Sequence, residues 1–510
     1  MNASFNWLDV LVLIVYLAAI LLMATKFVKE QKNLKDFFVA SGHMPWWAVG
    51  MSILATLLSA ISVTGIPAEF FEYGLQGFGI WWIATLVAAP IVILLFIKTF
   101  VGMQLTTAYE YLEVRFSLAV RLMAGLLFLL IRGLYIGVVL FASAIVLKPA
   151  FGGQLDVVTL IILAGVFSTA FAALGGIKAV IWTDVVQLVV VYVGIAWMVV
   201  TLVQRVDGGL ASFWRIAVAE GKDFSFLSNP EYWKLKLFTR TAFFPLLLGM
   251  ILNALYQKGA DQLTVQRYLA TRSPKDAARA MWTDILGAIP VTILLTMVGM
   301  GLFAFYQQNP DRINLALTKA NGVLPHFVVA ELPHGLSGLF MAAIVAAILT
   351  TVDSGINSLA TVTMTDFQMR LGQGPLSDAR GVFWARVWTV IWGVLTTLFA
   401  VFIYATATEN ISRVAFQVLG LFSGSVLSVF LLGILTKRAN STGVLIGTAL
   451  GSATAIWMNY FLVNRAGEHV CYTWPIVFGV GITLLAGYLF SLIFPRGLAG
   501  ATAKTLHAST

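Results

Sequence analysis

The chain has 510 residues, of which 59% are hydrophobic and only 11% are charged. Soluble globular domains carry about 25% charged residues, so this composition excludes a soluble protein and indicates an integral membrane protein. The formal net charge is +9, but its basic residues fall mainly between apolar segments, which explains the charge without a nucleic-acid partner.

Apolar segments of membrane-spanning length recur along the chain, and a bilayer core requires roughly 20 apolar residues per helix. About 13 transmembrane helices are expected, forming a single transmembrane domain over residues 1–510. Their ranges are 6–26, 46–71, 75–98, 119–147, 156–175, 179–203, 240–258, 279–306, 334–362, 385–407, 411–436, 441–463 and 472–494. The first segment lacks a basic leader, so we expect a retained helix rather than a signal peptide.

The basic residues between the spans predict an orientation. Alternate assignment of the loops places 20 Lys and Arg residues on one side and 11 on the other, with Lys258 and Arg267 in the larger set. Because cytoplasmic loops are enriched in basic residues, we expect the N-terminus outside and the C-terminus in the cytoplasm. The lack of a targeting signal is typical of a bacterial inner (plasma) membrane protein.

One basic residue, Arg132, lies inside the fourth span, in LLIRGLYIGVVLF. It lies roughly 20 Å from the start of that helix, which is too deep for its side chain to reach the surface easily. Arginines at such depth usually face the bundle interior or a water-filled cavity. We expect Arg132 either to neutralise an anionic substrate or to pair with an internal acid or a helix carbonyl.

The second span is the best candidate for a broken helix, because it combines closely spaced hydroxyl groups with Gly65 and Pro67, which interrupt helices. Freed carbonyls and hydroxyls of a broken helix are suitable ligands for alkali cations. The alternative is that these small residues only let helices pack closely. The hydroxyl-bearing residues are Ser52, Thr56, Ser59, Ser62 and Thr64.

A second polar wall is expected in the ninth span, in AAILTTVDSGINS (346–358). Residues three and four positions apart share one face of a helix. This face holds Ala347, Thr350, Thr351 and Ser354, and Asp353 and Asn357 widen it.

A further acid, Asp184, lies about one turn inside the sixth span. Acids and hydroxyls inside an apolar bundle indicate cation sites, whereas a helix cap is the structural alternative for Asp184.

Four stretches carry a resemblance to a known family: TTAYEYLEVRFS (106–117), GGIKAVIWTDVVQ (175–187), DQLTVQRYLATRS (261–273) and AAILTTVDSGINSLATV (346–362). Along nearly its whole length the chain resembles the sodium/solute symporter family. The resemblance implies an all-α, leucine-transporter-type fold with a five-plus-five inverted repeat, about 46–203 and 240–436. One extra N-terminal helix (6–26) and two peripheral C-terminal helices (441–494) would complete it. It also implies alternating access driven by an inward sodium gradient.

The resemblance implies a main sodium site built from the carbonyls of Ala55, Leu58 and Ala347 and the hydroxyls of Thr350 and Thr351. Some members bind a second sodium, and the corresponding residues here are Asp184, Thr350, Asp353 and Ser354. Asp353 stands where those members have a hydroxyl. It could strengthen a second cation site, carry a proton or pair with a basic group.

The implied substrate pocket is lined by Ser59, Ser62, Gly77 to Trp81, Arg132, Tyr256 and Gln257. Sugar-carrying members have an acid at the position of Trp81 and a lysine in the eighth span. This chain has neither, which weakens a hexose interpretation. Arg132 instead favours a sialic or other carboxylic acid, since a guanidinium binds a carboxylate bidentately.

The function expected is therefore import of a small organic solute with one or two Na+ ions, without an enzymatic reaction or an obligatory protein partner. The alternatives are a proton-coupled or sodium-independent carrier with Asp353 or Asp184 titrating, a sugar symporter, and a solute sensor. Only about 15 residues follow the last span, which disfavours a sensor with a signalling domain. Nucleotide-binding motifs are absent from the sequence, which disfavours ATP-driven pumping.

Overall fold

The computed structural model describes residues 6–27, 31, 33–103, 105–151, 154–238, 242–313, 320–333, 335–372, 377–406, 411–464 and 469–495. Some basic residues of the orientation count lie outside these ranges, namely Lys29, Lys32, Arg240, Lys319, Arg465, Arg496 and Lys504.

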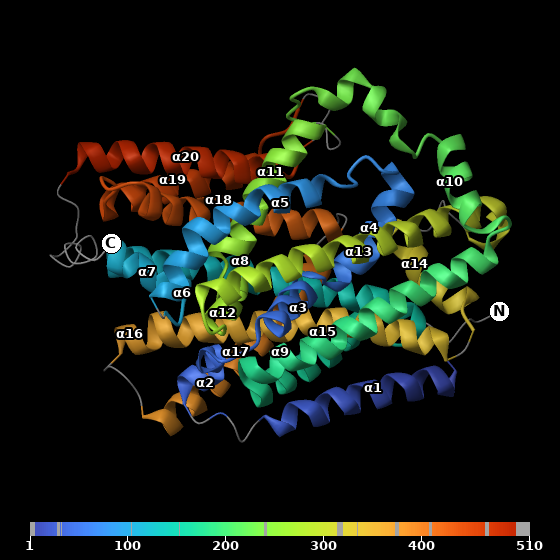
Figure 1. Cartoon of the computed structure of the whole chain (residues 1–510), viewed down its shortest axis with the longest axis horizontal. Coiled ribbons are helices and arrows are strands. Elements are labelled where there is room, and N and C mark those ends of the chain that lie inside the picture. Colours follow the sequence, from blue (N-terminus) through green and yellow to red (C-terminus); the bar gives the residue numbers. More distant parts are fainter. Residues whose placement is uncertain are drawn as a thin grey trace.

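Long helices run side by side along the longest axis of the molecule (Figure 1). The helices at predicted spans are α1 (Trp7–Lys26), α3 (Trp46–Leu57), α4 (Ala60–Tyr73), α5 (Ile80–Ile91), α8 (Leu118–Leu147), α9 (Val157–Arg205), α11 (Phe243–Leu255), α13 (Pro274–Gln308), α15 (Leu336–Val362), α17 (Asp378–Thr406), α18 (Ile411–Leu435), α19 (Ser441–Tyr460) and α20 (Trp474–Ile493). Shorter helices are α2 (Leu34–Val39), α6 (Lys98–Gly102), α7 (Ala108–Arg115), α10 (Gly209–Ala219), α12 (Gln262–Leu269), α14 (Ala320–Glu331) and α16 (Met369–Leu371).

Within the described ranges, 10 helices are long and apolar enough to cross a membrane, or 11 if the bent pair α3 and α4 is one span. The fold is therefore an all-helical membrane bundle, as the sequence predicted. One difference from the expected count lies in α9, whose 49 residues cover the predicted fifth and sixth spans. α9 is interrupted at Gly176, where φ is 54° and ψ is −180°, a conformation open to glycine because it has no Cβ.

The seventh span differs from its predicted range of 240–258. α11 ends at Leu255, a π-helical turn covers Tyr256–Ala260, and the chain resumes as α12 after Asp261. The predicted range stops before α12 because α12 is polar, and hydropathy alone assigns such a segment to a loop. Every residue of α12 is nevertheless buried, because neighbouring helices supply partners for its polar groups.

The second span is broken, as expected. α3 and α4 meet at a bend of 61° around Leu58 and Ser59. Leu58 leaves helical geometry, with φ −87° and ψ 76°. Gly65 and Pro67, which helped to single out this span, lie inside α4 and do not end it.

The helix α15 lies at the centre of the bundle. In its most apolar 18-residue segment 94% of the residues are buried, whereas 17% are buried in the corresponding segment of α1. α15 packs against α3, α8, α9 and α17. α1 lies along one edge of the bundle and α19 and α20 along the other (Figure 1). The polar residues of α15 are therefore enclosed by other helices and must find their hydrogen-bond partners within the bundle.

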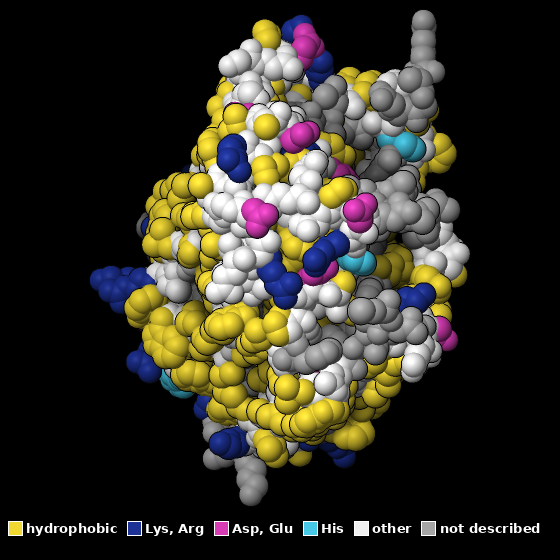
Figure 2. Space-filling view, turned by 90° about the vertical axis from the view of Figure 1, so that its right-hand side faces the viewer, with side chains coloured by type: hydrophobic (Ala, Val, Ile, Leu, Met, Phe, Trp, Pro, Cys, Tyr) yellow, Lys and Arg dark blue, Asp and Glu magenta, His cyan; other side chains and the backbone are white. Residues whose placement is uncertain are grey.

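Figure 2 shows the end of the bundle at which α10 and α14 lie. Charged side chains of both signs are spread over the middle of this face, while hydrophobic side chains gather along its rim. Large apolar side chains such as Val166, Leu398 and Leu485 are exposed on long helices. This distribution is typical of a bundle with apolar sides in lipid and polar ends in water.

Candidate ion and substrate site

The break between α3 and α4 faces two adjacent threonines of α15. Thr350 Oγ1 donates to the carbonyl of Ala55 at 2.9 Å, and Thr351 Oγ1 donates to the carbonyl of Thr56 at 2.9 Å. Both hydroxyls also lie close to the Ala347 carbonyl, at 3.3 and 3.1 Å. The carbonyls of α3 are available because the last turn of a helix has no intrahelical donors for them.

The structure thus gathers the predicted main-site oxygens of Ala55, Ala347, Thr350 and Thr351, and Leu58 is the C-cap residue of α3. Each threonine hydroxyl donates its proton to a carbonyl and retains lone pairs as an acceptor. Carbonyl and hydroxyl oxygens held in this way form a neutral cluster of hard ligands. Such a cluster can coordinate an alkali cation.

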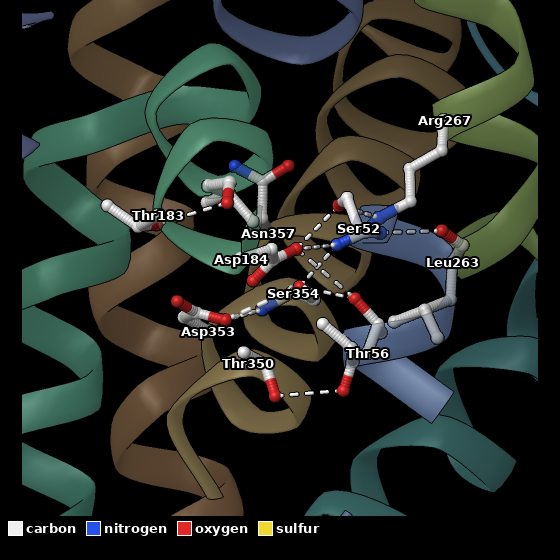
Figure 3. A network of polar contacts seen from close by, with 12 residues as sticks. Ser52, Thr56, Thr183, Asp184, Leu263, Arg267, Thr350, Asp353, Ser354 and Asn357 are labelled. Carbon is white, nitrogen blue, oxygen red and sulfur yellow. Dashed lines mark hydrogen bonds and ion pairs between the residues drawn. The ribbon is translucent and has the colours of Figure 1, made fainter. Parts of the chain in front are cut away.

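A charged network lies next to this cluster (Figure 3). Asp184 Oδ2 accepts hydrogen bonds from Ser52 Oγ at 2.5 Å and from Arg267 Nη2 at 3.2 Å. Arg267 also donates from Nε to Ser52 Oγ at 2.8 Å, and from Nη2 to Ser354 Oγ. Thr56 Oγ1 lies 3.2 Å from Ser354 Oγ and connects this network to the broken second span. α3, α9, α12 and α15 are therefore linked through polar side chains.

Arg267 is the main functional candidate that sequence reasoning missed. It was counted among the basic residues of a cytoplasmic loop, but its side chain is 1% exposed. The assignment failed because α12 reads as a polar loop, although its polar side chains bond to α3, α9 and α15. Asp184, Arg267 and Ser354 are far apart in the sequence, and nothing in their spacing indicated that the guanidinium of Arg267 lies between the other two side chains.

Asp184 was expected about one turn inside the sixth span, with a helix cap as the structural alternative. The cap alternative is wrong, because α9 continues on both sides of Asp184 and its carboxylate bonds to side chains of other helices. The acid lies eight residues beyond the interruption at Gly176. Its contacts with Ser52 and Thr56 place it beside the second half of α3, close to the break between α3 and α4.

Asp353 lies on α15 beside this network and is fully buried. Its Oδ1 accepts from the backbone N–H of Ser354 at 2.6 Å. Its Oδ2, like Oδ1 of Asp184, is buried without a hydrogen-bond partner among the described residues. Buried carboxylate oxygens are costly when unpaired, so this pair of acids favours an additional cation or a proton.

The predicted substrate residues lie on α4, α5, α8 and the π-helical turn Tyr256–Ala260. Arg132 on α8 is 3% exposed and pairs with Asp261, while its guanidinium carbon lies 5.2 Å from the centre of the Tyr135 ring. Pairing with an internal acid, one of the expected alternatives, therefore occurs. Arg132 Nε has no partner among the described residues.

The remaining substrate candidates lie on α4, on α5 and in the turn after α11. Ser59 is buried at the N-cap of α4, and Ser62 is half-buried in its first turn. Trp81 is the second residue of α5 and is half-buried. Tyr256 is buried in the turn that follows α11, and Gln257 beside it is half-buried.

A second buried ion pair at the seventh span was also missed. Lys258 bonds to Asp284 on α13, and their side chains are 3% and 2% exposed. Lys258 was counted as a cytoplasmic loop residue, which is wrong for the same reason as for Arg267. With both residues removed from the cytoplasmic set, the predicted excess of basic residues on that side is smaller but keeps its sign.

Comparison with known proteins gives a consistent result. The model of the sodium:solute symporter family matches residues 37–451. A sodium/sialic acid symporter of Aliivibrio fischeri is 31% identical over 495 residues, which cover 97% of this chain and 95% of the relative.

Two solved structures resemble this one. A Na+-coupled sialic acid symporter, in a substrate-bound outward-open state, has a TM-score of 0.88 and 30% identity, covering 96% of this chain and 99% of its own. A transporter of the nucleobase-cation-symport-1 family has a TM-score of 0.60 and 12% identity, covering 93% and 97%. The second likeness concerns the fold, which is of the leucine-transporter type.

Proposed function

Because this chain belongs to the sodium:solute symporter family, we propose that it imports a small carboxylate-bearing solute together with sodium. The family consists of sodium-coupled transporters rather than enzymes, so this integral membrane protein binds Na+ and a small solute. The observation that carries the anionic proposal is Arg132, a buried guanidinium next to the broken seventh span. The sialic acid carried by relatives is one solute with the required carboxylate.

The architecture proposed for this function has 13 transmembrane helices in one domain. α9 supports two spans, because 49 residues at 1.5 Å each reach about 74 Å, more than twice a bilayer core of about 30 Å. α11 with α12 supports one further broken span. The predicted repeats, 46–203 and 240–436, each open with a broken helix, and this correspondence supports the proposed repeat.

For the main sodium site we propose the oxygens of Ala55, Leu58, Ala347, Thr350 and Thr351. The distances of 2.9 to 3.3 Å among four of these residues support it. For a second cation we propose a position between Asp353 and Asp184, next to Ser354. Two carboxylates and the single guanidinium of Arg267 leave one negative charge there, and both acids keep an unpaired oxygen.

A proton at Asp353 is the second candidate, because its unpaired Oδ2 could equally be satisfied by protonation. The chain would then couple solute import to one sodium and one proton. The orientation proposed in either case has the N-terminus outside and the C-terminus in the cytoplasm of a bacterial plasma membrane.

The experiment is uptake of labelled solutes into proteoliposomes, with and without an inward sodium gradient. N-acetylneuraminate, lactate, glucose and an amino acid represent the competing classes of substrate. We expect sodium-driven accumulation of a carboxylate and none of glucose. Transport of glucose alone would establish a sugar symporter, whereas transport that ignores sodium but follows an imposed pH gradient would establish a proton-coupled carrier.

A further inference from the structure

The ion pair between Arg132 and Asp261 lies at the break of the seventh span. Asp261 joins the π-helical turn Tyr256–Ala260 to α12, and its Oδ1 caps α12 by accepting the N–H of Leu263 at 3.0 Å. Its Oδ2 accepts from Arg132 Nη2. One carboxylate thus caps the N-terminus of α12 and also binds the guanidinium of Arg132 in the proposed substrate pocket.

We propose that Asp261 occupies the place of the substrate carboxylate, and that an anionic solute binds by taking Arg132 from it. This inference rests on the proposed function, in which Arg132 receives the anion. Asp261 is thereby a specificity-determining residue. A neutral solute cannot replace it, because breaking the pair would leave both buried charges without a partner.

The hydrogen bonding of Arg132 makes such an exchange feasible. Asp261 engages Arg132 through Nη2, and Arg132 Nε has no partner among the described residues. A free carboxylate can bind through Nε and Nη2 together, a bidentate geometry that is stronger than a single contact. Asp261 uses Oδ1 to cap α12 and offers Arg132 only Oδ2, so the carboxylate of the solute can bind Arg132 more strongly than Asp261 does.

Two tyrosines are neighbours of Asp261 in the fold. The carbonyl of Tyr256 accepts the N–H of Asp261 at 2.9 Å, and Tyr109 follows Ala108, whose N–H donates at 2.8 Å to Gln262, the residue after Asp261. Both hydroxyl groups are buried and without a hydrogen-bond partner in the described part of the chain. The N-terminal amide of α12 already holds Asp261 Oδ1, and a hydroxyl donor could satisfy Oδ2 once Arg132 is taken.

The exchange would reach the ion sites through α12. Asp261 caps the first turn of this eight-residue helix, and Arg267 in its last turn contacts Asp184 and Ser354. A shift of α12 when Asp261 is released therefore changes the contacts of Arg267 directly. Substrate and sodium would then influence each other, reciprocally, through a single short helix.

The test is binding of N-acetylneuraminate and of its methyl ester to purified full-length protein in sodium chloride, measured by isothermal titration calorimetry. Asp261→Asn removes the competing charge and keeps a residue type that caps helices. We expect the Kd for the acid to fall about tenfold. In the wild-type protein most molecules have Arg132 paired with Asp261, which weakens the apparent affinity, and the variant lacks this competing carboxylate. The Kd for the ester should not change.

Asp284→Asn is the matched control, since it removes the acid of the other buried ion pair at the same break. It should leave the preference for acid over ester unaltered. If Asp261→Asn is not monodisperse, Asp261→Ser serves instead, and the double substitution Arg132→Gln with Asp261→Asn should abolish the preference for the acid.

Two outcomes overturn the proposal, and they differ. Wild-type protein that binds and imports the acid, together with an Asp261→Asn variant that binds it no more tightly, rejects the exchange alone. Wild-type protein that takes up neither N-acetylneuraminate nor lactate rejects the anionic function and the exchange with it.

Discussion

Arg267 Nη2 lies 3.2 Å from Asp184 Oδ2, and the two side chains are 1% and 0% exposed. This pair places a fixed positive charge of the protein beside the proposed ion sites, and the residues come from α12 and α9. The same guanidinium bonds to Ser52 and Ser354, so it connects α12 to the second and ninth spans as well. Any movement of α12 must therefore alter the surroundings of Asp184 and, through Ser354, those of Asp353.

Replacing Arg267 by Gln should destabilise the protein strongly. Removing one partner of a buried ion pair leaves an uncompensated charge and costs about 3–5 kcal/mol. Thermal unfolding of the purified variant in detergent should show a large fall in midpoint, which the double variant Arg267→Gln with Asp184→Asn partly restores. Arg279→Gln, at an exposed pair with Asp276, is the control. Equal effects of the two single substitutions would contradict a buried ionic role.

Replacing Thr351 by Ala should raise the sodium concentration for half-maximal uptake by about tenfold, because a hydroxyl ligand and its bond to the Thr56 carbonyl are lost. Sodium-dependent uptake at saturating solute measures the effect. Thr389→Ala is a matched control, because Thr389 is equally buried and bonds to a carbonyl of its own helix. An unchanged sodium requirement would remove Thr351 from the site.

Replacing Asp353 by Ser should lower the sodium Hill coefficient towards 1, because the negative charge proposed for the second cation is removed. Uptake measured against sodium concentration at several pH values provides the test. Asp353→Asn, which keeps the shape and removes the charge, should behave in the same way. A variant that keeps the Hill coefficient and loses only the pH dependence of uptake would instead support proton coupling.

Replacing Gly338 by Ala should loosen the contact between α1 and α15. A Cβ at Gly338 would lie 2.6 Å from the Cα of Asp9, whose carboxylate accepts the N–H groups of Gly335 and Gly338 at 2.6 and 2.9 Å. Overpacking of this kind costs about 1–3 kcal/mol, measurable as a lower unfolding midpoint. Gly102→Ala, where a Cβ would meet nothing within 4 Å, should have little effect.

Glu113 on α7 predicts a pH-dependent contribution to stability. Hydrogen bonds from Arg370, followed by those from Arg121, hold the pKa of Glu113 below its usual range despite partial burial. This contribution is complete above the pKa of the unfolded chain, about 4.3, and disappears as the pH falls through the lower folded value. Glu113→Gln should thus lower the unfolding midpoint at pH 7, and by progressively less as the pH falls below about 4.3. The exposed Glu220→Gln is the control, and a difference that does not shrink with falling pH would contradict the ionic explanation.

Local pattern in the sequence was sufficient for the membrane bundle, the family and the existence of a break in the second span. Apolar runs mark helices that must satisfy their own backbone in lipid, and this requirement acts within each segment. The spacing of Ala347, Thr350 and Thr351 likewise places them on one face, since the period of a helix is fixed. Their proximity to the carbonyl of Ala55 was expected from the resemblance to the family, whereas the bond from Thr351 to the carbonyl of Thr56 was not.

Only the tertiary structure decided where the charges of the seventh span belong. Arg267 and Lys258 read as residues of a basic loop, because their acids, Asp184 and Asp284, are distant in the chain or lie on another helix. Hydropathy counts a polar residue as costly in a membrane whatever surrounds it. A buried guanidinium is tolerated when other helices bring a carboxylate and hydroxyl groups to it, and that arrangement exists only in the folded bundle.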